Sequence, residues 1–147
     1  MRIYLDNCCY NRPYDDQSQI RISLETQAKI YIQDKISKHE LELASSYVLM
    51  AENDANQSEA KKDSIRNFIE DNSTVFVDIK HMDEIKEMII PIMASGIKYA
   101  DASHIACALF SKCDYFITTD KRVLKYQTES IKLRNPITLI AEMEDEL

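Results

Sequence analysis

Four acidic side chains, far apart in the sequence, are of the type that holds a divalent metal ion. They are Asp6, Glu52, Asp101 and Asp120. Carboxylates gathered at one point repel one another and raise their own pKa values unless a cation neutralises them. Oxygen ligands select Mg²⁺ or Mn²⁺ over zinc, and such ions activate a bound water and stabilise in-line displacement at a phosphodiester. If the fold brings the four acids together, the chemistry they support is metal-assisted hydrolysis.

The strand-like runs of the sequence predict where these acids lie. Short runs rich in β-branched or aromatic residues occur at 2–5, 41–45, 74–79, 115–118 and 137–140. Between them, apolar residues recur at helical spacing over 24–36, 85–92 and 102–109. Strands alternating with helices predict a three-layer α/β/α domain with a central, mostly parallel sheet of about five strands.

Two of the acids come at the ends of predicted strands. In parallel α/β sheets the ligand site lies beyond the carboxyl ends of the strands, which favours Asp6 and Asp120. Asp101 is expected at the start of a helix, where it would serve equally well as an N-cap. Glu52 is expected about two helical turns beyond the second strand. Helix capping or solvated charge explains each acid taken singly, but the four together favour a metal site.

Length and charge set limits on the interpretation. The 147 residues predict one domain, 1–147, ending in an acidic tail over 141–147. The formal charge of -7 argues against a protein whose whole surface is basic for nucleic-acid binding, although local positive charge remains compatible with it. The apolar run at the N-terminus is broken by Asp6, so no signal peptide or spanning helix is expected. The predictions are a cytoplasmic location, no membrane partner, and reduced cysteines.

The segments that carry the four acids resemble the motifs of bacterial PIN-domain proteins, in particular the VapC-like toxin ribonucleases. These segments are IYLDN at 3–7, SYVLMAE at 46–52, ADASHIA at 100–106 and YFITTD at 115–120. The resemblance implies a PIN-like parallel sheet, endoribonuclease activity, and Mg²⁺ or Mn²⁺ bound by the four acids. Among them Glu52 has competitors, because Asp54 and Glu59 lie close to it in the sequence.

The same resemblance implies supporting residues and partners. Asn7, Thr118 and Thr119 match polar positions that orient metal ligands by hydrogen bonding. Many relatives are toxins of type II toxin–antitoxin pairs, and many dimerise. The partners it implies are therefore an RNA substrate, an antitoxin protein and a second copy of the chain.

Positive residues near the acids are candidates for RNA binding. Arg12 stands in a polar loop beside Tyr10 and Tyr14, and arginine with aromatic rings is suited to single-stranded RNA. An equally open role for Arg12 is a structural pairing with an acid, with Asp15 or Asp16 capping the next helix. Lys121 and Arg122 follow Asp120 directly. His104, three residues after Asp101, is expected to pack or hydrogen-bond near the site rather than to act as a general base.

Two other functions compete with the nuclease. A catalytically silent PIN-fold module would bind RNA or a protein without turnover, and retention of all four acids argues against it. A phosphoacceptor switch domain would use an acid such as Asp78 after the third strand. It would also need paired acids after the first strand, where Asp6 is followed by Asn7. Phosphoryl transfer from a small donor distinguishes this class from a nuclease.

Overall fold

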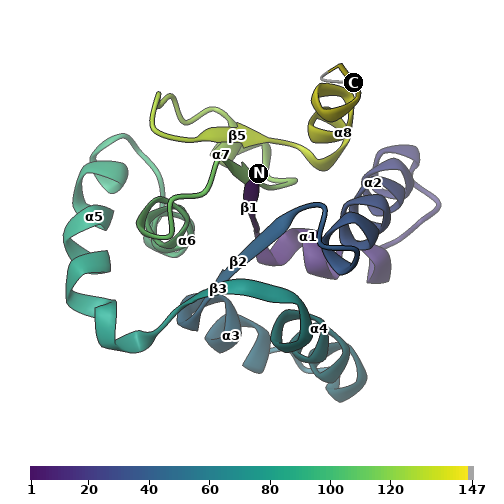
Figure 1. Cartoon of the computed structure of the whole chain (residues 1–147), viewed down its shortest axis with the longest axis horizontal. Helices are drawn as coiled ribbons and strands as arrows, with labels where there is room; N and C mark the ends of the chain where they lie inside the picture. The colour runs from purple at the N-terminus through teal and green to yellow at the C-terminus, as the bar shows by residue number, and fades with distance from the viewer. Residues whose placement is uncertain (146–147) are drawn as a thin grey trace.

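The computed structural model of the chain describes residues 1–145 and contains a sheet of five parallel strands (Figure 1). The strands are β1 (Arg2–Leu5), β2 (Glu42–Ser46), β3 (Ser73–Val77), β4 (Tyr115–Ile117) and β5 (Lys132–Arg134). Their order across the sheet is β3-β2-β1-β4-β5, and every neighbouring pair is parallel. The predicted α/β class with a mostly parallel sheet is therefore confirmed.

Helices connect the strands and cover both faces of the sheet. They are α1 (Asn7–Asn11), α2 (Ile20–Ser37), α3 (Tyr47–Asp54), α4 (Glu59–Asn72), α5 (Met82–Ala94), α6 (Tyr99–Phe110), α7 (Lys121–Leu124) and α8 (Pro136–Asp145). Short 3₁₀ turns occupy Arg12–Tyr14 and Ile79–His81. The helices predicted over 24–36, 85–92 and 102–109 correspond to α2, α5 and α6.

Alternating side chains of the strands divide the core into two layers. In β1, Ile3 and Leu5 pack with Ile32 of α2, whereas Tyr4 packs on the opposite face with Ile105 of α6. Figure 1 shows α5 and α6 on one side of the sheet and α2, α4 and α8 on the other. Both faces are covered, as the near-continuous burial of the central strands requires.

The strand predicted over 137–140 is wrong, because these residues lie in α8. Asn135 accepts a hydrogen bond from the amide of Ile137 at 2.9 Å, and Pro136 takes the first helical position, where its missing N–H costs nothing. Leu139 is buried in the same core layer as α2. The fifth strand is instead Lys132–Arg134, whose single apolar residue gives almost no strand pattern.

The acidic residues expected in a C-terminal tail lie in α8 as far as Asp145. Glu142 accepts hydrogen bonds from Arg134 at 2.6 Å and from the Tyr115 hydroxyl at 2.7 Å. Glu146 and Leu147 lie outside the described residues. The four cysteines are free. Over residues 1–145, no helix has the length and apolar character needed to cross a membrane.

The order of the strands reverses beside β1. The chain runs from β1 outward through β2 to β3, then returns to the other side of β1 to form β4 and β5. The carboxyl ends of β1 and β4 therefore flank a topological switch point, which is where open α/β sheets bind ligands. Asp6 and Asp120 follow these two strand ends.

Candidate metal centre

Asp6 is held at the end of β1 by hydrogen bonds from two elements. Its carboxylate accepts from the Asn7 amide at 2.8 Å, capping α1, and from the Thr118 hydroxyl at 2.9 Å. The Thr118 oxygen also accepts from the Asp120 amide at 3.1 Å. Thr118 is buried, and its hydroxyl links the ends of β1 and β4. These contacts suit the supporting role that the sequence predicts for Thr118.

Asp120 and Asp101 line one small cavity. Asp120 accepts from the amide of Arg122 at 2.9 Å and caps α7. Asp101 lies in the first turn of α6, but the N-cap of that helix is Lys98, so Asp101 is not used as a cap. The cavity has a volume of about 110 Å³, and Lys98 and Arg122 also line it. Two acids and two cations thus meet beside the carboxyl end of β4.

Glu52 reaches the site from α3. Its two carboxylate oxygens accept from the Asn7 side-chain amide at 3.2 Å and from His104 Nε2. Asp54 is instead paired with Arg66, and Glu59 is paired with Lys62. Asp54 and Glu59, the two alternatives to Glu52, therefore both form ion pairs with cations of α4. Asn7 contacts Asp6 through its backbone and Glu52 through its side chain, which agrees with the supporting role predicted for it.

The charges of the four acids act on one another. Burial raises the pKa of Asp101, and the negative charges of Asp6, Asp120 and Glu52 raise it further. The four predicted acids therefore share one electrostatic neighbourhood although they come from four separate elements. A bare cluster of this kind favours protonation of one member or capture of a cation.

A buried chain of hydrogen bonds supports Glu52 from the core. His104 is 1% exposed, and its Nδ1 lies 2.7 Å from the Tyr4 hydroxyl, which lies 2.7 Å from the Ser46 hydroxyl. The hydrogen bond from His104 lowers the pKa of Glu52. Burial acts to lower the pKa of His104, but the bond to Glu52 and the nearby acids outweigh it and raise that pKa. Both shifts favour the charged pair.

Sequence reasoning placed His104 near the site but missed Tyr4 and Ser46. One available signal was Tyr4, whose position inside a buried strand requires a partner for its hydroxyl. Ser46 also accepts from the Leu49 amide at 3.1 Å and caps α3, which carries Glu52. The same small network therefore fixes both the helix and the side chain of Glu52.

The basic residues predicted to bind RNA differ in whether they already form ion pairs. Arg12 pairs with Asp15 at 2.9 Å and with Glu25 at 3.1 Å, the structural role that sequence left open. Neither Asp15 nor Asp16 caps α2, because that helix starts after Gln19. Lys121 and Arg122 are exposed, and within residues 1–145 neither forms an ion pair.

The side chains present fit a hard divalent cation. The donors are four carboxylates, with amide and hydroxyl groups around them and the buried Thr119 beside them. In the part of the chain that the structure describes, no three His, Cys, Asp or Glu side chains are grouped closely enough to hold a metal ion by themselves. Unneutralised carboxylates repel one another, and Glu52 is held toward His104. Mg²⁺ usually keeps several of its waters and is bound through only one or two carboxylates, so it does not require three side chains in direct contact.

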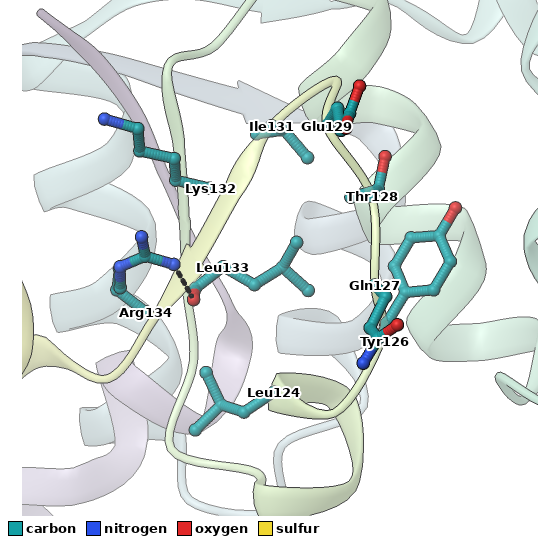
Figure 2. Close-up of a pocket in the computed structure, with 9 residues that line it drawn as sticks. All are labelled: Leu124, Tyr126, Gln127, Thr128, Glu129, Ile131, Lys132, Leu133 and Arg134. Atoms are coloured by element: carbon teal, nitrogen blue, oxygen red, sulfur yellow. Dashed lines mark hydrogen bonds between the residues drawn. The ribbon is translucent and has the colours of Figure 1, made fainter.

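A cavity of about 770 Å³ lies away from the four acids, between β5 and the loop after α7 (Figure 2). In Figure 2 the side chain of Leu133 points from β5 toward the loop that carries Tyr126 and Thr128. The walls include no carboxylate except Glu129 and contain none of the predicted acids. Its size therefore does not make it a candidate catalytic site.

Comparison with known proteins identifies the fold. No protein-family model matches the chain, and no curated protein matches it. Among solved structures, a chain in the crystal structure of VapBC2 from Rickettsia felis bound to a DNA fragment from their promoter matches with a TM-score of 0.58. The two sequences are 15% identical, and the match covers 92% of this chain and 98% of that chain. The chain has a PIN-like α/β fold along almost all of its length.

Proposed function

We propose that this chain is a Mg²⁺- or Mn²⁺-dependent endoribonuclease of the cytoplasm, which hydrolyses RNA phosphodiester bonds as the toxin of a toxin–antitoxin pair. One observation carries the proposal. The Thr118 hydroxyl donates to Asp6 and accepts from the amide of Asp120, and Asp120 lines one cavity with Asp101. Within a PIN-like fold at the switch point of the sheet, this convergence supports a metal centre more directly than a set of unrelated helix caps.

The residues have distinct proposed roles. Asp6, Asp101 and Asp120, with Glu52, would hold one or two divalent ions. Such ions lower the pKa of a bound water and stabilise the charge that develops on the phosphate. Thr118 keeps the carboxylate of Asp6 in place through its hydroxyl. Asn7 and His104 orient Glu52, whose side chain is 44% exposed.

The test is RNA cleavage and metal binding by the purified protein beside its Asp6→Asn and Asp101→Asn variants. We expect wild type to cut RNA with Mg²⁺ or Mn²⁺ and not with EDTA, and calorimetry to show metal binding that both variants lose. Asp78→Asn is the matched control, because Asp78 also follows a parallel strand and caps a 3₁₀ turn. Its charge is not among the causes that raise the pKa of Asp101. It should retain both properties.

Other results would favour the competing functions. A wild-type protein that neither binds metal nor cuts RNA after removal of all partners contradicts the nuclease and favours a binding module. Loss of function in Asp78→Asn together with phosphoryl transfer from a small donor would favour the phosphoacceptor class. Asparagine is nearly isosteric with aspartate, so folding should survive in each variant, and circular dichroism checks this.

An apolar groove supports the part of the proposal that concerns an antitoxin. It has a volume of about 260 Å³ and lies between α2 and α8, where Leu24, Ala28, Tyr31, Ile137 and Ile140 line it. VapC is a PIN-domain toxin, and the matched structure is of VapBC2. We expect Leu24→Glu to abolish co-purification of a small protein partner while leaving RNA cleavage intact. Should Leu24→Glu instead convert a dimer to a monomer in light scattering, the groove binds a second copy of the chain.

A further inference from the structure

Arg21 is a second arginine beside the acids, and the sequence motifs do not include it. Its Nη2 donates to the backbone carbonyl of Thr119 at 2.9 Å. The Thr119 residue stands between Thr118, which binds Asp6, and Asp120. The guanidinium of Arg21 is therefore attached to the segment that carries one side of the candidate metal centre.

A buried carboxylate holds this arginine in place. Glu25 is 0% exposed and lies one helical turn after Arg21, whose Nε is 3.3 Å from it. Glu25 also binds Arg12 at 3.1 Å and accepts from the Asn135 side chain. A buried carboxylate is costly unless cations and hydrogen bonds neutralise it. Its partners join the first loop, α2 and the start of α8, so the position of Arg21 is built into the core.

One side of the Arg21 guanidinium remains available to a ligand. The side chain is 44% exposed, and within residues 1–145 its only polar contacts are those to Thr119 and Glu25, made through Nη2 and Nε. Nη1 therefore has two donors to offer. Arg21 also lies in the first turn of α2, where the helix dipole disfavours a positive side chain. Arg12, by contrast, is bound by two carboxylates and its side chain is only 18% exposed.

Cations also stand on the other side of the acids. Lys98 and Arg122 line the cavity that contains Asp101 and Asp120, and both are exposed without an ion-pair partner in the described part of the chain. Arg21 comes from α2, on one face of the sheet, whereas the cavity with Lys98 and Arg122 includes the start of α6, on the other face. Positive charge on both sides of a metal centre suits a polyanionic strand that passes across it.

We propose that Arg21 binds a backbone phosphate of the RNA strand next to the bond that is cut, with Arg122 and Lys98 holding the strand beyond the acids. This assignment rests on the proposed nuclease function. Arginine is suited to the contact because its guanidinium can bind Glu25 and Thr119 through some donors and a phosphate through others. Arg21 is a substrate-binding residue in this scheme, and Glu25 positions it.

The experiment measures binding separately from cleavage. In an Asp101→Asn background without added metal, in which cleavage is abolished and one negative charge of the site is removed, fluorescence anisotropy gives the Kd for a labelled single-stranded oligouridine at several salt concentrations. Arg21→Gln should weaken binding about tenfold, the loss of a charge-assisted contact. It should also reduce the slope of log K against log salt by about 0.7, the value for one phosphate contact on a single strand. Arg21→Lys should recover most of that slope, since it keeps the charge.

Arg2→Gln is the matched control. Arg2 also binds one backbone carbonyl, that of Ser111 at 2.6 Å, and one carboxylate, that of Glu42 at 2.9 Å. It lies at the amino end of β1, opposite the acids. We expect Arg2→Gln to leave both affinity and salt slope unchanged, which separates loss of a phosphate contact from general destabilisation.

The outcomes distinguish this proposal from the one on which it rests. If Arg21→Gln binds RNA with the affinity and salt slope of Arg2→Gln, the Arg21 assignment is overturned even when wild type cuts RNA. If the Arg21 effects appear as expected but wild type never cuts, the phosphate contact stands and the nuclease falls. Absence of RNA binding by every form of the protein, including the folded background protein, overturns the assignment.

Discussion

Two buried tyrosines allow the hydrogen-bond chain behind Glu52 to be tested against simple burial. Tyr4 and Tyr10 are 0% and 1% exposed, and both side chains are packed in the core. The Tyr4 hydroxyl binds His104 and Ser46, each at 2.7 Å, whereas the Tyr10 hydroxyl is buried and has no hydrogen-bond partner among residues 1–145. The change Tyr→Phe removes the same single atom from each, so packing is matched and only hydrogen bonding differs.

The expected free energies of unfolding follow from these contacts. Tyr4→Phe leaves the buried Nδ1 of His104 without a partner, which costs about 1–3 kcal/mol. Ser46 loses one contact but keeps the Leu49 amide. Tyr10→Phe removes an unsatisfied buried hydroxyl, so we expect no loss of stability and a gain of up to about 1 kcal/mol. A difference of about 2 kcal/mol between the two variants corresponds to roughly 4–8 °C in Tm for a domain of this size.

Urea denaturation and thermal melting of the metal-free protein measure the stability difference, and calorimetry measures metal affinity. We expect Tyr4→Phe to weaken Mg²⁺ or Mn²⁺ binding about 10- to 100-fold, because His104 loses the group that orients it toward Glu52. Tyr10→Phe should bind metal like wild type. Equal losses of stability in the two variants, or unchanged metal affinity in Tyr4→Phe, would refute the reasoning.

Two further predictions concern the buried Lys29 and the half-buried Cys8. Burial lowers the pKa of Lys29 from 10.5 to about 8, so the folded chain binds fewer protons than the unfolded chain between these values, and stability should rise with pH across that window. Lys29→Met should remove this rise and stabilise the protein at pH 7 by at most about 3 kcal/mol, measured by urea denaturation at pH 7 and 10. Cys8 is half-buried and its pKa is lowered, chiefly by a hydrogen bond from Cys9, whereas the other cysteines are buried with raised pKa values. A thiol reagent should therefore modify one cysteine in the folded protein, and Cys8→Ser should abolish that reaction.

Four of the five strands were predictable from sequence, including the edge strand β3, whereas the edge strand β5 was not. Residues 2–5 were predicted and observed as β1, because a short β-branched and aromatic run of this kind is typical of a central parallel strand. Residues 137–140 have similar composition but form a helix. The decisive signal there is local, since Asn135 and Pro136 together start a helix. β5 has only one buried residue, so its pairing with β4 specifies it more than its composition does.

The four acids of the candidate site could be selected from the sequence for a similar reason, whereas the side chains that contact them could not. An acid that follows a strand is recognised from a few neighbouring residues, and the parallel sheet then places its end beside the others. The contacts of Tyr4 with Ser46 and His104 join residues 42 and 100 positions apart. The contact of Arg21 with Thr119 spans 98 positions. A single sequence does not say which partner a buried polar residue takes, because the two residues lie far apart along the chain.

The negative net charge of the chain is compatible with a nucleic-acid substrate, because some cations near the candidate site are not paired with acids. Several acids far from the site are paired, as Glu42 is with Arg2 and Glu142 is with Arg134. Near the site the cations Lys98 and Arg122 have no acidic partner in residues 1–145, and the carboxylates there oppose a phosphate until a cation neutralises them. Metal and RNA should therefore bind cooperatively, and by linkage each would raise the affinity of the other by the same factor. Under the proposed function, the divalent ion would decide when this acidic protein attracts a polyanion, in addition to supplying the chemistry.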